Sequence, residues 1–334
     1  MLIGAGLDAR LTLPFDELRE AARLARDLGF ESLWTPAGGV PDAFHVCSAW
    51  LADTGLRTGT SVVGAARGWS PLTLALQTAT LAQLHDGKFI LGLGTGGTGA
   101  AFFAANGYPN RPIAVMRDFA VTVKALLAGE TVTYEGRGLR FGPGSLGLRG
   151  PVQAPVYLAA LGPQMLRLCG EVADGALLNW ASPERIAASR ELVAEGAAAA
   201  GRAATDITVS MYIRVCVDED VDAARRAFGL QAVSYAMTGG YRALFAHMGF
   251  DDVLVELEAR KAAGEAMTAI VDAAPDEMLQ AVGYYGPAAG AAAAYARLSA
   301  GLDETVVRVI TARPGLDAVA GTLEALTPER ICAA

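Results

Sequence analysis

The sequence is poor in the side chains that most enzymes use for chemistry. Its 334 residues include only three histidines and three lysines. Lys88 lies at the amino end of an expected strand, whereas Lys124 and Lys261 lie on expected helices, so none is placed to form a Schiff base. No His-x-His pair or carboxylate cluster completes a metal site, and no Gly-x-Ser-x-Gly elbow appears. A protein with so few catalytic side chains can take its chemistry from a bound cofactor.

The net charge and the cysteine content limit the binding partners and the cellular compartment that we expect for this protein. The net charge of −8 argues against a nucleic-acid partner, which would need a basic face. Cys47, Cys169, Cys216 and Cys332 form no Cys-x-x-Cys pair, so we expect free thiols in a reducing cytoplasm. No basic segment precedes the first expected strand, and the alanine-rich residues 288–296 are too short to span a bilayer. We therefore expect a cytoplasmic protein with neither a nucleic-acid nor a membrane partner.

Residues 155–180 contain one complete strand, helix and strand unit. An apolar run of strand length covers residues 156–160, and Pro163 suits the first position of the helix that follows. Residues 176–178 form the next strand, which should lie parallel to the first with a right-handed crossover. The turn at residues 160–163 then lies at the carboxyl end of a strand and at a helix N-terminus. Free N–H groups and the helix dipole favour a phosphate at such a turn.

The same unit recurs along the chain and predicts the fold class. Eight strands alternating with helices over this length are typical of a single-domain (β/α)8 TIM barrel, α/β in class, spanning residues 1–334. An open, doubly wound sheet is the alternative. We expect two additions to the barrel. The first is a small hairpin decoration at 129–151, and the second is a helical insertion at the rim around 235–285. The insertion belongs to a longer region, 218–300, for which the sequence pattern predicts helices throughout. The expected strands are residues 2–7, 30–35, 57–64, 88–94, 156–160, 176–178, 207–217 and 305–310.

A glycine-rich stretch follows the fourth expected strand. Residues 92–97 match Gly-x-Gly-x-x-Gly, but residues 94–111 read as a loop, whereas the dinucleotide motif needs a helix to begin at once. A flexible loop and a loop that lies against a ligand both fit this pattern. In either case glycine lets the backbone approach a flat ligand closely.

Four stretches of sequence together resemble a known superfamily. They are TSVVGAA at 60–66, LAQLHDGKFILGLGTG at 81–96, PVYLAALGP at 155–163 and GEVADGALLNW at 170–180. These stretches resemble the luciferase-like monooxygenase superfamily, and most closely its branch of oxidoreductases that use the deazaflavin coenzyme F420. The resemblance covers nearly the whole chain. It implies a (β/α)8 barrel, a late insertion, a flavin or deazaflavin at the carboxyl mouth of the barrel, and a homodimer.

The resemblance also implies which residues bind the cofactor. Residues 63–66 match a family segment that forms a bulge behind the ring, often with a non-prolyl cis peptide, for which Gly64 is the expected partner. Residues 94–96 match the loop that lies along the cofactor, and residues 159–162 match the turn that holds its phosphate. Asn179 should complete the pocket wall. The expected cofactor-binding residues are therefore Gly64, Ala65, Ala66, Gly94, Thr95, Gly96, Ala159, Ala160, Leu161, Gly162 and Asn179.

The catalytic candidates are Asp8, His45 and Asn179, and each also has a structural interpretation. Asp8 could face the ring or form a turn, His45 could be a catalyst or a surface residue, and Asn179 could bind the ring or the substrate or cap a helix. Some family members carry an acidic residue and a histidine after the second strand, where this chain has Thr35 and Pro36. The proton-handling residues of those members therefore cannot be transferred.

Three functions fit the sequence. The first is hydride transfer between coenzyme F420 and an unidentified organic substrate, with the insertion acting as lid and specificity region. The second is an FMN-dependent two-component monooxygenase, in which the ring must form an oxygen adduct. The third is a non-catalytic barrel that binds a ligand. Tryptophans at positions 34, 69 and 180 are expected near the mouth, where indoles would suit a flat aromatic ligand.

Overall fold

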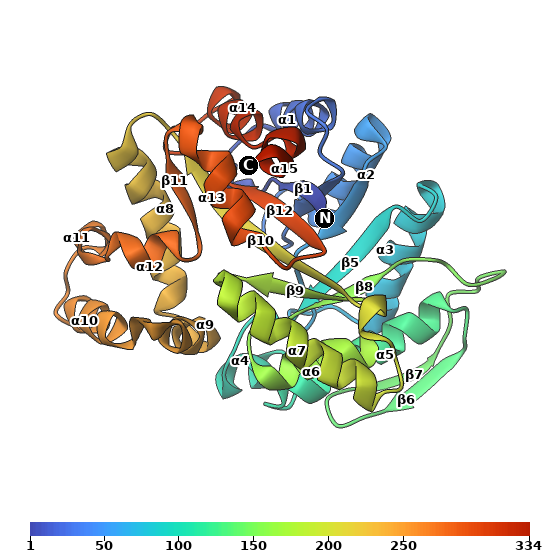
Figure 1. Cartoon of the computed structure of the whole chain (residues 1–334). Helices are drawn as coiled ribbons and strands as arrows, with labels where there is room; N and C mark the ends of the chain where they lie inside the picture. The colour runs from blue at the N-terminus through green and yellow to red at the C-terminus, as the bar shows by residue number, and fades with distance from the viewer. The chain divides into compact units, whose positions relative to one another are not determined.

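The computed structural model describes all residues from Met1 to Ala334. Its main sheet has the strand order β11-β10-β12-β1-β2-β3-β5-β8-β9, and β9 also pairs with β10, so the parallel sheet closes on itself. This confirms the expected (β/α)8 barrel (Figure 1). Its strands are β1 (Leu2–Gly6), β2 (Ser32–Thr35), β3 (Arg57–Thr60), β4 (Val63–Gly64), β5 (Phe89–Gly94), β8 (Val156–Ala159), β9 (Gly175–Asn179), β10 (Thr208–Val217), β11 (Gly283–Gly286) and β12 (Glu304–Val309).

The barrel strands are buried on both faces, as parallel strands covered by helices must be. Every residue of β2, β5 and β12 is buried. Glycines make the close strand packing possible: a Cβ on Gly92 would lie 1.9 Å from the carbonyl oxygen of Thr60. The Thr60 hydroxyl in turn donates to the Gly92 carbonyl at 3.1 Å and accepts from the Gly92 N–H at 3.0 Å.

The chain forms two compact units. Unit 1 comprises residues 1–31, 178–189 and 210–334, and unit 2 comprises residues 32–177 and 190–209. Two helices of unit 2 begin at capping signals that the sequence contains. The Asp42 side chain accepts from the N–H groups of Phe44 and His45 at the start of one helix, and Ser70 caps the next. Unit 2 holds α2 (Ala43–Thr54), α3 (Pro71–Leu84), α4 (Ala100–Ala105), α5 (Pro112–Leu127) and α6 (Pro163–Val172), while α7 (Pro183–Ala199) continues from unit 1 into unit 2.

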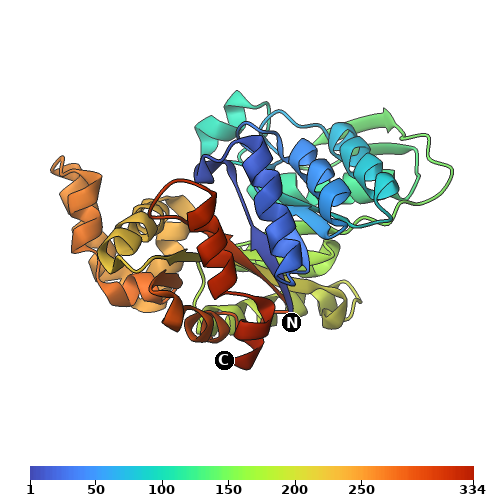
Figure 2. The ribbon, with the colours of Figure 1, turned by 90° about the horizontal axis from the view of Figure 1, so that it is seen from above.

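Unit 1 contains both chain ends. Its strands β1 and β12 pair in parallel from Leu2 with Glu304 to Gly6 with Arg308. Helices α1 (Phe15–Asp27) and α14 (Leu316–Ala325) lie side by side over these strands (Figure 2). Two further helices, α13 (Ala288–Leu298) and α15 (Pro328–Ala333), complete this part of the unit.

The late helical region contains a strand that the sequence analysis missed. Between β10 and β11 lie α8 (Val221–Ala236), α9 (Gly239–Phe245), a helical turn at Ala246–Phe250, α10 (Asp251–Ala262), α11 (Met267–Ala273) and α12 (Asp276–Gln280). Residues 283–286 then extend and pair in parallel with β10, although residues 218–300 read as helical. The sequence Gly-Tyr-Tyr-Gly is too short and too glycine-flanked to show strand periodicity. Its partner strand, which is distant in sequence, decides its conformation.

The segment 129–151 contains an antiparallel hairpin, β6 (Val132–Glu135) and β7 (Arg140–Gly144), which packs against α5 (Figure 1). The preceding loop, 94–111, also differs from the expectation, because Ala100–Ala105 form the short helix α4 within it. No helix of the chain combines the length and the apolar character that crossing a membrane would require.

Candidate active site

Two segments of unit 2 pack closely together with only small side chains, and their partly exposed edge is formed by Thr95 and Gly96. We call residues 64–66 and 94–96 the ledge. The Ala65 N–H donates to the Gly94 carbonyl at 2.8 Å, and the Ala66 N–H donates to the Thr95 carbonyl at 3.3 Å. A Cβ on Gly64 would lie 2.6 Å from the Cα of Gly96, so both positions require glycine. The structure thus brings together six of the residues expected to bind the cofactor.

Arg67 fixes the edge of the ledge. Its guanidinium Nε donates a hydrogen bond to the Gly96 carbonyl, and its guanidinium carbon lies 5.3 Å from the centre of the Phe102 ring. Phe102 belongs to α4 and also covers Gly97, where a Cβ would lie 2.5 Å from the ring. Helix α4 therefore holds the glycine-rich loop in place, and the glycines of residues 92–97 serve close packing. They do not form a dinucleotide-binding motif, because Gly92 and Gly94 lie within β5 and α4 begins only after Gly99.

The turn after β8 adjoins the ledge. A Cβ on Gly94 would lie 3.5 Å from the Cβ of Ala159, and the Ala160 N–H donates to the Leu177 carbonyl at 3.0 Å. Gly162 is the N-cap residue of α6, with no side-chain cap, and Pro163 takes the first helical position as the sequence predicted. A Cβ on Gly162 would meet no atom within 4 Å, so the space before this helix is open. An open, uncapped helix N-terminus attracts an anion.

Two of the three expected mouth tryptophans lie in the protein core. The Trp34 indole is fully buried, donates to the Ser32 hydroxyl at 2.9 Å and lies 6.1 Å from the Tyr157 ring. Trp180 has an exposed fraction of 1%. Only Trp69 is partly accessible, and its ring lies 5.4 Å from that of Phe44. Trp34 and Trp180 are therefore packed as core residues, and of the three indoles only that of Trp69 is accessible to a ligand in this structure.

Unit 1 carries a polar cluster around the buried Arg214, which also includes Arg10, Asn179, Tyr235 and Tyr241. The Arg214 side chain extends from β10, and its Nη1 donates to the Asn179 Oδ1 at 2.5 Å. The Asn179 Nδ2 donates to the Tyr241 hydroxyl at 2.8 Å. The Asn179 amide is therefore engaged at both of its polar atoms.

Arg214 is a desolvated cation with spare hydrogen-bonding capacity. The residue is 3% exposed, and its Nε has no hydrogen-bond partner. Its guanidinium lies 4.0 Å from the centre of the Trp180 ring and 5.0 Å from that of Tyr235. Burial lowers the pKa of Arg214 from its ordinary value, and the neighbouring tyrosines oppose that shift. Trp180 has a left-handed backbone with φ of 55°. The rings of Phe228 and Tyr235 pack against its indole and hold it beside Arg214.

The pKa values of the two tyrosines in the cluster are shifted in opposite directions. Burial raises the pKa of Tyr235, but the Arg214 and Arg10 guanidiniums outweigh it, so the net pKa is below the ordinary value. Burial raises the pKa of Tyr241, and its hydrogen bond with Asn179 opposes this only in part. Tyr235 is therefore the phenol in this cluster that can release a proton more easily.

Residues 3–304 match the family model described as luciferase-like monooxygenase. The chain belongs to the luciferase-like monooxygenase family. This confirms the resemblance found in the sequence. It also supports an enzyme over a barrel that only binds a ligand.

Relatives of this luciferase-like protein are similar over most of its length. A 5,10-methylenetetrahydromethanopterin reductase from Methanolobus tindarius is 28% identical over 240 residues, covering 71% of this chain and 72% of the relative. An F420-dependent glucose-6-phosphate dehydrogenase from Microbacterium testaceum is 30% identical over 227 residues, covering 63% of this chain and 66% of the relative. The solved coenzyme F420 dependent tetrahydromethanopterin reductase from Methanopyrus kandleri has a TM-score of 0.78 and 22% identity, covering 98% of this chain and 99% of that chain. This structural likeness shows the shared fold.

The family's non-prolyl cis peptide occurs in this luciferase-like chain, but not at the residue expected. The cis bond joins Ser61 and Val62, whereas we expected Gly64 to be a partner in it. Gly64 serves a different purpose, because its missing side chain allows the close contact with Gly96 that builds the ledge.

The catalytic candidates Asp8 and His45 have structural partners. The Asp8 carboxylate accepts from the Arg10 N–H at 2.7 Å and forms a buried ion pair with Arg308. His45 lies on α2 with a side chain 79% exposed, and its Nδ1 lies 2.8 Å from the Asp42 Oδ1. These contacts match the turn-forming and surface interpretations of the two residues. Their catalytic roles stay predictions.

The sequence analysis missed Tyr235 and Tyr241 as candidate site residues. Both lie in or beside the helical insertion, on α8 and α9, where their spacing follows only the helical period. Arg214 lies on β10. No local motif could have shown that this arginine meets two tyrosines and Asn179, because the contacts join segments that are more than 20 residues apart.

Proposed function

We propose that this protein is an oxidoreductase that transfers a hydride between coenzyme F420 and an organic substrate. The observation that carries the proposal is the ledge beside the open Gly162 turn. A flat ring needs a surface without protruding side chains, and Thr95 and Gly96 are the partly exposed residues of the ledge, with Gly64 packed behind them. A phosphate needs free N–H groups, and the uncapped N-terminus of α6 is open. The names of the relatives, a glucose-6-phosphate dehydrogenase described as F420-dependent among them, support this cofactor.

The residues present fit such a cofactor, and each would have a definite role. Gly64, Ala65 and Ala66, with residues 94–96, would support one face of the ring. Residues 159–162 would hold the phosphate. The deazaflavin, when bound, accepts or gives the hydride, so the protein contributes orientation and exclusion of water.

The polar cluster around Arg214 is the proposed site for the substrate's polar group. Active sites of (β/α)8 barrels lie at the carboxyl ends of the strands, and Asn179 ends β9. The unpartnered Nε of Arg214 can donate to an oxygen of the substrate. Within unit 1, the Tyr235 phenol, with its lowered pKa, can exchange a proton with a ligand bound to this cluster.

A titration of the purified protein with F420, and separately with FMN, tests this proposal. Tryptophan fluorescence reports binding, because Trp69 is partly accessible and belongs to unit 2, which also contains the ledge. We expect saturable quenching by F420 and none by FMN at the same concentrations. Tight binding of FMN alone would favour the two-component monooxygenase of the same family. Binding of neither cofactor would overturn the proposal.

We also propose that the protein is a homodimer. Helix α3 contains no charged residue, and Leu72, Leu76 and Leu84 on its outer face are exposed. A helix that is apolar on its solvent side favours burial against a partner. Sedimentation velocity should show the mass of a dimer, and Leu76→Glu should shift the population toward monomer. A monomeric wild-type protein at micromolar concentration would refute this proposal.

A further inference from the structure

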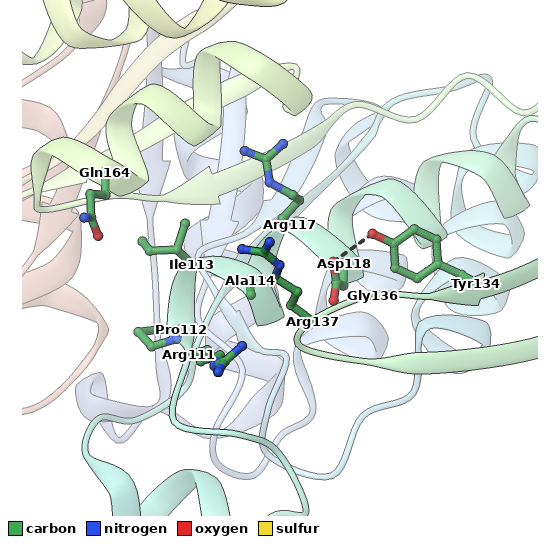
Figure 3. A pocket seen from close by; sticks show the side chains of 10 residues that line it. All are labelled: Arg111, Pro112, Ile113, Ala114, Arg117, Asp118, Tyr134, Gly136, Arg137 and Gln164. Carbon is green, nitrogen blue, oxygen red and sulfur yellow. Dashed lines mark hydrogen bonds between the residues drawn. The ribbon is translucent and has the colours of Figure 1, made fainter.

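A cavity in unit 2 lies next to the Gly162 turn. Its volume is about 850 Å³, and it is bounded by the first turns of α5, the tip of the β6–β7 hairpin and the start of α6. Three arginines line it, Arg111, Arg117 and Arg137, and Gln164 lies at its other end (Figure 3). Because Gln164 follows Gly162 by two residues, this cavity adjoins the helix N-terminus proposed to hold the phosphate.

The cavity is positive although the whole chain carries a net charge of −8. Its three guanidiniums face one carboxylate, Asp118, which is already fully engaged. The Asp118 carboxylate accepts from the Tyr134 hydroxyl at 2.8 Å and from the N–H groups of Gly138 and Leu139 at 2.6 and 3.0 Å. Of the arginines, only Arg117 has an ion pair, with Glu171.

Arg111 and Arg137 have no hydrogen-bond or ion-pair partner for their side chains in the structure. Arg111 is the N-cap residue of α5, where its side chain makes no capping bond. Arg137 lies in the hairpin turn, between Gly136 and Gly138. Two guanidiniums that line one cavity without partners can each make paired hydrogen bonds to a carboxylate or phosphate.

The hairpin turn that carries Arg137 is held firmly against α5. A Cβ on Gly136 would lie 2.2 Å from the Asp118 Oδ2, and one on Gly138 would lie 2.3 Å from the Val115 nitrogen. Both positions therefore need glycine to fit. Burial and the hydrogen bond with Asp118 together raise the pKa of Tyr134 to about 12, so the phenol stays a donor at neutral pH. The hairpin is thus a fixed wall that presents Arg137 to the cavity.

We propose that this cavity binds an anionic chain, bearing carboxylate or phosphate groups, that continues from the cofactor phosphate at the Gly162 turn. The proposal rests on the proposed use of coenzyme F420. The volume is that of an ordinary small-ligand site and is larger than one phosphate needs. The hairpin decoration then has a binding function, because it completes the cavity and supplies one of its two unpaired cations.

The test compares two ligands and two double variants at low ionic strength. The ligands are F420 and the same deazaflavin chromophore without its phosphate-bearing side chain. The first variant, Arg111→Gln with Arg137→Gln, removes both unpaired cations of the cavity. The matched control, Arg140→Gln with Arg149→Gln, removes two exposed arginines of the same hairpin region that do not line the cavity. Fluorescence titration gives the affinity of each of the three proteins, wild type, cavity variant and control variant, for each of the two ligands.

We expect wild type to bind F420 more tightly than the truncated chromophore. The cavity variant should bind F420 about tenfold more weakly, because exposed guanidiniums contribute modestly even in good geometry, and should bind the chromophore as wild type does. The control variant should match wild type for both ligands. Inorganic phosphate should compete with F420 and leave chromophore binding unchanged.

The outcomes separate this inference from the proposed function. Unchanged F420 affinity in the cavity variant, or an equal loss in the control variant, would overturn the cavity assignment while the cofactor proposal stands. Equal loss of chromophore and F420 binding in the cavity variant would show structural damage and overturn it as well. Binding of neither ligand by wild type would refute the proposed function and this inference together. If inorganic phosphate bound to the cavity equally tightly in the absence of any deazaflavin, its occupant would be a free anion. That result would overturn the link with the cofactor.

Discussion

Replacing Gly162 by aspartate should weaken cofactor binding and stabilise the protein at the same time. Gly162 has the extended backbone, φ of −102° and ψ of 163°, that an N-cap residue adopts, and its Cβ would meet no atom within 4 Å. Aspartate is among the best N-cap residues, and its charge complements the helix dipole, so we expect a gain of about 0.5 to 1 kcal/mol in the free energy of unfolding. The fold should therefore tolerate the change.

The same carboxylate would stand where the cofactor phosphate is proposed to bind. Two unit charges roughly 5 Å apart repel by about 0.8 kcal/mol in water and by about 3 kcal/mol at an effective dielectric of 20. Gly162 is half-buried, so an intermediate value of about 2 kcal/mol applies, and the Kd for F420 should rise roughly 30-fold. Binding should recover in part at high salt, because salt screens the repulsion.

The assay pairs the fluorescence titration with thermal unfolding. Gly162→Asn is the matched variant, since asparagine caps a helix as well as aspartate but carries no charge. It should also weaken F420 binding, because its side chain competes for the same N–H groups, but less than aspartate does, and the difference between the two variants measures the effect of the charge. Gly150→Asp is the control for the added charge alone, at a glycine with equal space around it in the loop after the hairpin. An unchanged Kd in Gly162→Asp would refute the phosphate assignment, and a lower Tm would refute the local geometry on which the prediction depends.

Two further predictions concern packing and titration. Gly92→Ala would place a Cβ 1.9 Å from the Thr60 carbonyl oxygen in the barrel core, so urea unfolding should show a loss of about 3 kcal/mol, whereas Gly150→Ala should change stability by less than about 0.5 kcal/mol. A small effect of Gly92→Ala would mean that the β3 and β5 backbones can separate. In wild type, tyrosinate absorbance should begin to rise at a lower pH than for free tyrosine, because the pKa of Tyr235 is lowered and the phenol loses its proton earlier. Tyr235→Phe should abolish that early step and Tyr241→Phe should leave it, since the pKa of Tyr241 is raised; an early step that survives Tyr235→Phe would contradict the assignment.

Local sequence determined the elements whose causes are local. Pro163 at a helix start, Asp42 and Ser70 as caps, and the apolar runs of β5 and β12 act within a few residues of the structure they specify. The repeated strand and helix unit then limited the topology to very few choices, because parallel strands need right-handed crossovers. For that reason the barrel could be predicted, and the family resemblance agreed with it.

The sequence was a weaker guide wherever a distant partner decides the outcome. Strand β11 exists because β10 offers it a hydrogen-bonded edge, and its own four residues carry no strand signal. The positions of Trp34 and Trp180 near strand ends did not show whether they contact a ligand or the core, and the structure packs them against Tyr157, Phe228 and Tyr235. The cis peptide bond joins Ser61 and Val62 and does not involve Gly64, which packs against Gly96.

By itself the sequence determined the barrel and the helix N-terminus at Gly162, since these depend on strand periodicity and on Pro163 at the helix start, while the family resemblance marked the residues of the ledge. Only the tertiary structure joined Arg214 to Asn179 and the two tyrosines, and only it showed that Arg111 and Arg137 line one cavity. The physical reason is that desolvation and charge proximity arise from packing between segments that are far apart in the chain. Such packing leaves no periodic or local mark in the sequence.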